Sequence, residues 1–216
     1  MQLYNDDCLN VMRLMADKSV DLILTDPPYG IGAADYKRGG TQHGASAAPS
    51  KEYGSLDWDN APPGREYFDE MMRVSKHQII FGGNHLVEYL RNSACWIVWD
   101  KDNGNNGYAD CELAWCSFSS AVRRFKYRWH GMLQQDMKNK EDRIHPTQKP
   151  VRLFEWILEK YAEPGWTIMD PFLGSGSTAI AANRLGFDFI GVEREQTYFE
   201  AALERIPRET AQQALF

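Results

Sequence analysis

The sequence lacks long hydrophobic runs, paired cysteines and an excess of positive charge, and each absence excludes a class of protein. No apolar run approaches the roughly 18 residues of a membrane span. The acidic residues Asp6 and Asp7 stand where a signal peptide carries positive charge. We therefore expect a cytoplasmic protein with no membrane partner. The four cysteines form no C-x-x-C pair, which favours reduced thiols, and no metal site is predicted.

Charge and size set further bounds. The formal net charge is -6, which argues against a protein that coats nucleic acid non-specifically. A local basic strip can still supply phosphate contacts. With 216 residues, of which 43% are hydrophobic, the chain can bury one substantial core. We expect a single domain over residues 1–216, with insertions.

The most informative stretch covers residues 22–30, where an apolar run of strand length ends in Asp-Pro-Pro-Tyr-Gly. Open α/β sheets place their active sites at the carboxyl ends of such strands. The two prolines stiffen the loop and remove two N–H donors. Asp26 and the carbonyl of Pro27 can then accept hydrogens from an amino group, and the ring of Tyr29 can stack on a planar base. The alternative interpretation is a proline-stiffened turn.

A second motif lies at residues 166–179, where a short strand, a glycine-rich turn and a helix start of small residues follow one another. Gly174 and Gly176 let the backbone approach a ligand. The next predicted strand, residues 187–192, ends in Glu193, a carboxylate at the position expected to bind ribose hydroxyls. These features form the first half of a nucleotide-binding βαβ unit.

Together the two motifs resemble those of DNA amino-methyltransferases, which transfer a methyl group from S-adenosylmethionine to an exocyclic amine of adenine or cytosine. Asp-Pro-Pro-Tyr resembles their catalytic motif, which assigns catalytic roles to Asp26, Pro27, Pro28 and Tyr29. The second motif resembles their cofactor motif. By this resemblance cofactor contacts are expected from Asp26, Asp170, Pro171, Phe172, Gly174, Ser175, Gly176, Ser177, Thr178 and Glu193.

The order of the motifs indicates a subclass. The catalytic loop precedes the cofactor loop, as in the permuted class labelled beta, in which target recognition lies between the two. The resemblance therefore implies an α/β, Rossmann-like methyltransferase fold with circularly permuted motifs. Its sheet is expected to be mostly parallel, of the seven-stranded type, with helices on both faces.

Two further segments are assigned to the cofactor by resemblance. Residues 145–150, His-Pro-Thr-Gln-Lys-Pro, resemble the motif that opens the cofactor-binding half, with Pro150 suited to the first helical position. Thr147, Gln148 and Lys149 then precede a helix N-terminus, which favours an anionic group. By resemblance that group is the methionine carboxylate, to which Lys149 adds a point charge. An ordinary capped helix is the alternative.

The upstream pair Asp7–Cys8 carries the other assignment. Apolar residues at helical spacing predict a short helix from about residue 8, with Asp6 or Asp7 as its N-cap. The resemblance adds that Asp7 and Cys8 lie against the adenine of the cofactor. Capping and cofactor binding both remain open for Asp7.

DNA contacts are expected from two regions. Residues 33–63 predict a long mobile insertion loop, made basic by Lys37 and Arg38, for which a disordered surface insertion is the alternative. Residues 118–143 form a small target-recognition segment, in which one strand face carries Arg124, Lys126 and Arg128. A solvated edge strand is the alternative for this basic strip.

The expected function is site-specific methylation of adenine in double-stranded DNA by direct attack after base flipping. Alternatives are a cytosine amino-methyltransferase, a non-catalytic DNA-binding subunit, an NAD-dependent dehydrogenase and a protein glutamine methyltransferase. A ring-carbon cytosine methyltransferase is excluded, because it needs a nucleophilic cysteine after proline and no cysteine here follows one. A homodimer and a partner nuclease of a restriction-modification system are left open as partners.

Overall fold

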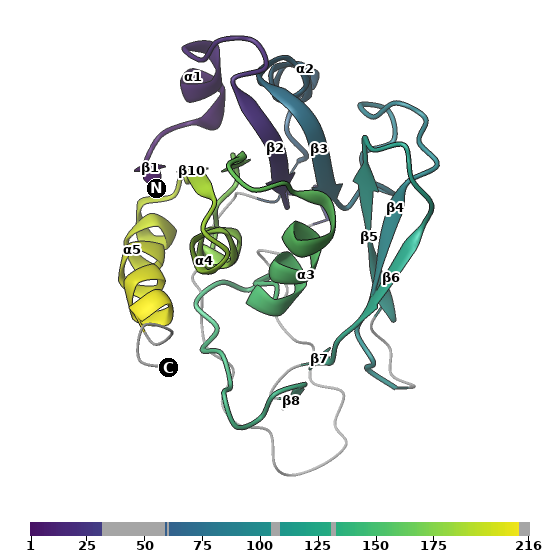
Figure 1. The fold of residues 1–216 in the computed structure, drawn as a ribbon, viewed down its shortest axis with the longest axis vertical. Helices are drawn as coiled ribbons and strands as arrows, with labels where there is room; N and C mark the ends of the chain where they lie inside the picture. The colour runs from purple at the N-terminus through teal and green to yellow at the C-terminus, as the bar shows by residue number, and fades with distance from the viewer. Residues whose placement is uncertain (32–58, 60, 105–108, 131–132, 212–216) are drawn as a thin grey trace.

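The computed structural model describes residues 1–31, 59, 61–104, 109–130 and 133–211 (Figure 1). The described helices are α1 (Cys8–Arg13), α2 (Arg65–Val74), α3 (Val151–Tyr161), α4 (Ser177–Arg184) and α5 (Gln196–Ala211). The described strands are β1 (Gln2–Tyr4), β2 (Val20–Thr25), β3 (Ser75–Phe81), β4 (Trp96–Asp100), β5 (Cys111–Cys116), β6 (Arg123–Lys126), β7 (Trp129–His130), β8 (Leu133–Gln134), β9 (Thr167–Asp170) and β10 (Asp188–Val192).

Eight strands form one sheet in the order β1-β10-β9-β2-β3-β5-β4-β6. The five strands from β1 to β3 run parallel, β5 is antiparallel to both neighbours, and β6 is parallel to β4. The predicted mostly parallel α/β sheet is therefore confirmed. It has eight strands rather than seven, because β6 adds to the outer edge of β4.

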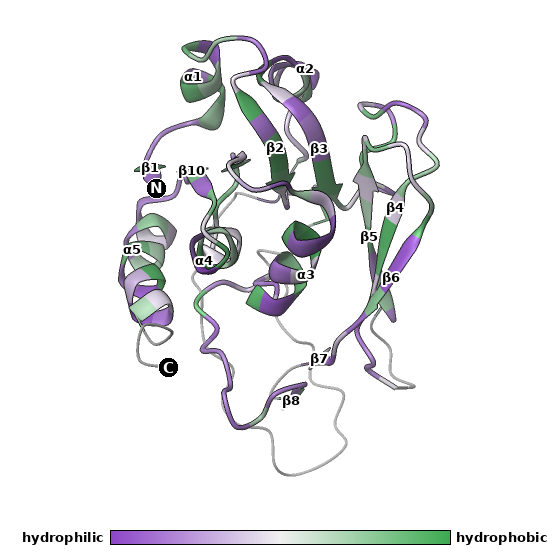
Figure 2. Cartoon of the chain, viewed as in Figure 1, coloured by the Kyte–Doolittle hydropathy of each residue, from purple (hydrophilic) through white to green (hydrophobic). Residues whose placement is uncertain are grey.

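The alternation of side chains along β2 shows why the sheet is covered on both faces. Leu22 and Leu24 pack into a core with α3, α4 and α5, whereas Ile23 points into a second core with α1 and α2. All three side chains are fully buried, as expected for a central parallel strand. Figure 2 shows β2 as mainly hydrophobic and β6 as mainly hydrophilic. The predicted helices on both faces are confirmed.

The sheet order brings the two sequence motifs together. β2, which leads into Asp-Pro-Pro-Tyr, pairs in parallel with β9, which leads into the glycine-rich turn. At their carboxyl ends the hydroxyl of Thr25 donates to Oδ1 of Asp170 over 2.7 Å. Segments 145 residues apart in sequence therefore end side by side at one edge of the sheet.

Three local expectations meet the structure differently. Asp7 is the N-cap of α1, as predicted, with its Oδ1 accepting from the Leu9 amide over 2.8 Å. Pro150 is the N-cap of α3 rather than its first residue, with an extended ψ of 142°. Among the described residues, no helix combines the length and hydrophobicity needed to cross a bilayer.

The prediction that Arg124, Lys126 and Arg128 lie on one strand is wrong for Arg128. β6 ends at Lys126, and Trp129–His130 pairs with Leu133–Gln134 in a separate two-stranded sheet. A strand continues only while it has a partner, and β4 ends at Asp100. Beyond it Asp102 adopts a left-handed φ of 47°, which ends the extended backbone of this segment.

Candidate active site

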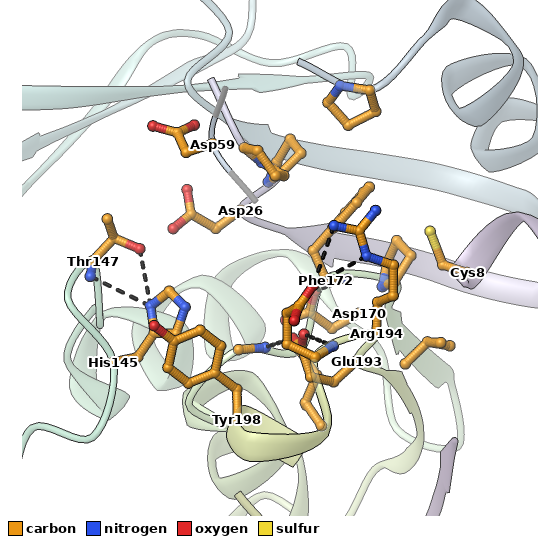
Figure 3. Close-up of a pocket in the computed structure, with 18 of the residues that line it drawn as sticks. Cys8, Asp26, Asp59, His145, Thr147, Asp170, Phe172, Glu193, Arg194 and Tyr198 are labelled. Atoms are coloured by element: carbon orange, nitrogen blue, oxygen red, sulfur yellow. Dashed lines mark hydrogen bonds and ion pairs between the residues drawn. The ribbon is translucent and has the colours of Figure 1, made fainter. Parts of the chain in front are cut away.

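One cavity of about 430 Å³ lies at the carboxyl ends of β2 and β9. Figure 3 shows Asp26 and Asp59 on one side of it and Glu193 and Tyr198 on the opposite side. Most of the predicted site residues line this cavity: Asp7, Cys8, Asp26, Pro27, Pro28, Tyr29, Thr147, Gln148, Lys149, Asp170, Pro171, Phe172, Gly174, Ser175, Ser177, Thr178 and Glu193. The fold thus gathers the predicted catalytic residues and most of the predicted cofactor residues around one space.

The Asp-Pro-Pro-Tyr loop is held rigidly from two directions. The hydroxyl of Tyr29 donates to Oδ1 of Asp26 over 2.5 Å. From outside the motif, Oδ1 of the buried Asp59 accepts the amides of Tyr29 and Gly30 over 2.8 and 2.9 Å. The ring of Tyr29 packs directly on Gly82, where an added Cβ would overlap the ring. The aspartate and the ring therefore keep fixed positions before any substrate binds.

Lys149 contacts Asp26 directly. Its ammonium pairs with Oδ2 of Asp26 and, at 3.0 Å, with Glu112 from β5. It also donates to the Tyr29 hydroxyl over 3.3 Å. The side chain of Lys149 is 4% exposed and that of Asp26 is 19% exposed, so Asp26 faces the cavity and Lys149 lies behind it. The structure therefore places Lys149 against the Asp-Pro-Pro-Tyr loop, whereas the resemblance assigned it to the methionine carboxylate.

The carboxylates of the cofactor half are fixed by backbone amides. Glu193 accepts from Gly174 N through Oε2 and from Glu195 N through Oε1, each over 2.8 Å. Asp170 accepts from Phe172 N over 3.1 Å, and burial raises the pKa of Asp170 to about 6. Lone pairs on Glu193 remain for a ligand hydroxyl.

Gly174 and Gly176 differ in their relation to the cavity. Both have left-handed φ angles, 51° and 75°, which a residue with a side chain rarely adopts. Gly174 lines the cavity, but Gly176 is the N-cap of α4 and packs against Ile206, 3.0 Å from the position of an added Cβ. Gly176 therefore shapes the turn from behind rather than lining the cavity.

Asp7 and Cys8 lie at the end of the cavity formed by α1. Oδ2 of Asp7 accepts from the hydroxyl of Tyr67 over 2.7 Å, and the ring of Tyr67 lies 6.4 Å from that of Phe172. Cys8 is buried, and burial raises the pKa of its thiol well above the usual range. An uncharged thiol and two rings create an apolar surface on which a flat heterocycle can pack.

His145 closes the opposite end of the cavity as a neutral imidazole. Burial, followed by the nearby charge of Lys149, lowers the pKa of His145 to about 3. Its Nδ1 accepts from the Thr147 amide over 3.3 Å, and its ring packs edge-on against Tyr198 with centroids 4.2 Å apart. The side chain of Gln148 bonds to the preceding loop, where its Oε1 accepts from Ile144 N over 2.9 Å.

Comparison with known proteins identifies the family. A family model described as DNA methylase matches residues 98–204. The type II methyltransferase M.HinfI of Haemophilus influenzae is 26% identical over 246 residues. The type II methyltransferase M2.DpnII of Streptococcus pneumoniae is 25% identical over 250 residues. The chain belongs to the DNA methylase family.

The extent of these matches differs between relatives. The alignments cover 93% of the chain and 66% of M.HinfI, and 97% of the chain and 90% of M2.DpnII. The chain is also similar to the crystal structure of the M1.HpyAVI–SAM complex, at 23% identity and a TM-score of 0.57. That match covers 94% of the chain and 98% of the M1.HpyAVI chain. This similarity shows that the chain has the same fold as M1.HpyAVI.

Of the predicted DNA-contact residues, the described ones, Arg124, Lys126 and Arg128, lie outside the cavity lining. Lys37 and Arg38 belong to the predicted 33–63 loop, and residues 32–58 and 60 lie outside the described residues. Lys126 and Arg128 are exposed, but both pair with Asp102, at 2.8 and 2.7 Å. Arg124 is 71% exposed and reaches Asp100 at 4.0 Å. The basic strip is therefore partly neutralised by two acids, Asp100 at the end of β4 and Asp102 just after it.

Several cavity residues of the DNA methylase were missed by the sequence analysis. Tyr67 on α2 lines the cavity, but the sequence around it shows only helical spacing of apolar residues. Asp59 stands at the end of the predicted mobile loop, where no local pattern distinguishes it. Glu112 offered the one usable signal, since it is a lone carboxylate within the otherwise apolar strand β5.

Proposed function

We propose that this chain transfers a methyl group from S-adenosylmethionine to the exocyclic amine of adenine in double-stranded DNA. One observation carries the proposal: a single cavity holds both the Asp-Pro-Pro-Tyr loop after β2 and the glycine-rich turn after β9. The first offers acceptors for an amine, and the second offers a turn and a carboxylate that suit a nucleoside. Membership of the DNA methylase family supports the same activity.

The residues around the cavity fit the proposed cofactor. Glu193, held by two backbone amides, would accept the ribose hydroxyls. The adenine ring would lie against Phe172, Cys8 and Tyr67 at the apolar end of the cavity. S-adenosylmethionine supplies the electrophilic methyl group when bound. The methionine part would extend toward Thr147 and the start of α4.

Catalysis by these residues would consist mainly of orientation. An exocyclic amine is deactivated by conjugation with its ring, so its hydrogens must be held while its lone pair points at the methyl group. Asp26 and the carbonyl of Pro27 would accept the two hydrogens, and Tyr29 would stack on the extruded base. The attack is direct, with no covalent intermediate on the protein. As the nitrogen–methyl bond forms, the bond from methyl carbon to sulfonium sulfur would break and leave S-adenosylhomocysteine, and the extra proton on the amine would pass to water.

Adenine is proposed over cytosine from the motif itself. Asp26 stands where serine is more often associated with cytosine amine methylation, and Tyr29 is a tyrosine rather than another aromatic residue. Both bases offer a conjugated amine and a π-face, so the motif carries this choice. Digesting DNA that the purified protein has methylated, and identifying the modified nucleoside by mass, tests it. The proposal expects N6-methyladenine, whereas amino-methylated cytosine alone would overturn the choice of base.

We also propose that the basic strip of Arg124, Lys126 and Arg128 follows the DNA backbone. Replacing all three by alanine should weaken duplex binding and flatten its salt dependence, by about one unit of slope for each phosphate that the protein no longer neutralises. Titrating labelled duplex at several salt concentrations measures both effects. An unchanged slope would show that the strip is a solvated edge.

Asp102 provides a control of opposite sign for this experiment. It pairs with Lys126 and Arg128, whose hydrogen bonds lower the pKa of Asp102 and keep it ionised. Asp102→Asn removes this competing charge, so duplex binding should become tighter and steeper in salt. Weaker binding by Asp102→Asn would show that its role is to hold the strip in shape.

The remaining partners are proposed from the resemblance alone. The recognition segment, residues 118–143, is short for reading a long DNA site unaided. A homodimer would double this surface, and a partner nuclease would place the protein in a restriction-modification pair. A cytoplasmic location follows from the same proposal, because the DNA of a bacterial cell lies there.

A further inference from the structure

The catalytic carboxylate stands at the end of a chain of alternating charges. Asp26 pairs with Lys149, Lys149 pairs with Glu112 at 3.0 Å, and Glu112 pairs with Lys101 at 2.5 Å. These four residues come from the end of β2, the loop before α3, strand β5 and the residue after β4. The sheet order, rather than any local motif, brings them together.

We infer that Lys149 and Glu112 are positioning residues for Asp26, with opposite effects on its charge. Lys149 holds the carboxylate ionised and aimed at the cavity, and Glu112 limits how strongly that positive charge acts. The inference rests on the proposed function, which makes Asp26 the acceptor of the amine hydrogens.

The contacts of Lys149 argue against a role in holding the methionine carboxylate. An ammonium group has three N–H donors. Nζ of Lys149 already lies against three oxygens, those of Asp26, Glu112 and the Tyr29 hydroxyl. It also lies over the ring of Phe81, 4.9 Å from the centroid, on the core side of the cavity. A cofactor carboxylate would have to displace one of these partners.

Lys149 and Glu112 have opposite effects on the pKa of Asp26. Burial raises the pKa of Asp26, Lys149 opposes that shift, and Glu112 reinforces it. Burial by itself would raise the pKa of Glu112, but Lys149 and Lys101 outweigh it and lower that pKa to about 2. Because Glu112 stays ionised, its negative charge and burial both disfavour the ionised form of Asp26. Among these groups Lys149 is the one that favours that ionised form.

All charged and titratable groups around Asp26 enter the expected pH dependence. Those that face it or its direct partners are Tyr29, Asp59, Lys101, Glu112, His145, Lys149 and Asp170. Tyr29 keeps its proton, because burial and the charge of Asp26 raise its pKa well above the usual value. His145 stays neutral, since its pKa is about 3. Lys149 and Glu112 are therefore the two charged groups whose removal changes the pKa of Asp26 most directly.

The two substitutions should shift the acid limb of the pH–rate profile in opposite directions. Methyl transfer requires ionised Asp26, so activity falls as the pH drops through its pKa. Lys149→Met removes the opposing positive charge, so the limb should move to higher pH by about 1–3 units. Glu112→Gln removes a negative charge and should move the limb to lower pH. Lys76→Met, at the exposed start of β3, is the matched control and should leave the acid limb at its wild-type pH.

The experiment follows kcat against pH for the full chain on duplex DNA, with S-adenosylmethionine affinity measured in parallel by calorimetry. Cofactor affinity should stay within a few-fold in Lys149→Met. A large loss of cofactor affinity with an unmoved acid limb would return Lys149 to the methionine carboxylate. Shifts in the same direction in both variants would also overturn the inference.

A second measurement separates this inference from the proposed function. Carbon-13 NMR of labelled aspartate follows the titration of the Asp26 carboxyl without turnover. Opposite shifts of this carboxyl in Lys149→Met and Glu112→Gln support the positioning role even if the wild-type protein methylates no DNA. An unmoved carboxyl in an active protein overturns it. Should Lys149→Met fail to fold, the direction of the Glu112→Gln shift decides.

Discussion

Asp26→Ala should abolish methyl transfer to DNA, with kcat falling on the order of 10³-fold or more. The reason is geometric, because the carboxylate faces the cavity on a loop that Asp59 and Gly82 hold in place. Without it only the carbonyl of Pro27 is left to orient the amine, and no carboxylate opposes the conjugation of the amine with its ring. S-adenosylmethionine affinity should stay within roughly tenfold, since Asp26 only adjoins the cofactor end of the cavity. Initial rates with labelled cofactor, together with calorimetry, measure both quantities.

Asp26→Asn is the matched control for this result. The alanine variant also leaves the buried Lys149 with one partner fewer, which costs stability. Asparagine keeps the shape and one acceptor oxygen but presents an NH₂ group, so turnover should be low while the fold is retained. Near-normal turnover in either variant would sink the role assigned to Asp26.

Glu193→Ala should weaken S-adenosylmethionine binding by about 1–3 kcal/mol, the cost of leaving buried hydrogen-bonding groups unpaired. The substitution frees two ribose hydroxyls in the proposed complex and also releases the amides of Gly174 and Glu195. Loss of these bonds loosens the glycine-rich turn that shapes the cofactor end. At saturating cofactor, turnover should recover much of its wild-type value. Titration calorimetry at a fixed pH measures the affinity.

Two controls sharpen the result for Glu193. Glu193→Gln keeps one oxygen acceptor and should lose less affinity than alanine. Glu204→Ala, on an exposed position of α5, removes a similar charge outside the cavity lining and should leave affinity unchanged. Equal affinity in Glu193→Ala and the wild type would mean that the ribose lies elsewhere.

The sequence predicted those parts of the fold that local signals determine. Apolar runs ending at Asp26 and at Asp170 predicted β2 and β9, and the Gly174 turn predicted the start of α4. The resemblance also assigned Asp26 to the cofactor together with the glycine-rich turn, which implies that the two motifs lie at one site. The structure places them there, on adjacent strands.

Pairings between distant segments could not be predicted in the same way. Whether Lys149 meets Glu112 depends on β5 running antiparallel between β3 and β4, which no spacing in the sequence encodes. The prediction that Arg128 shares a strand with Arg124 and Lys126 was wrong, because periodicity does not reveal where the partner strand ends. The neutralisation of Arg128 by Asp102 was hidden for a similar reason, since a left-handed turn presents that carboxylate.

The most direct test of the central claim is the identity of the methylated nucleoside. Purified protein is incubated with unmethylated duplex DNA and S-adenosylmethionine that carries a deuterated methyl group, and the DNA is digested to nucleosides. Chromatography with mass detection should show N6-methyladenine heavier by the three deuterium atoms, in wild-type reactions and not in those of Asp26→Ala. Label found only in protein, or no label in any DNA base, would contradict the account.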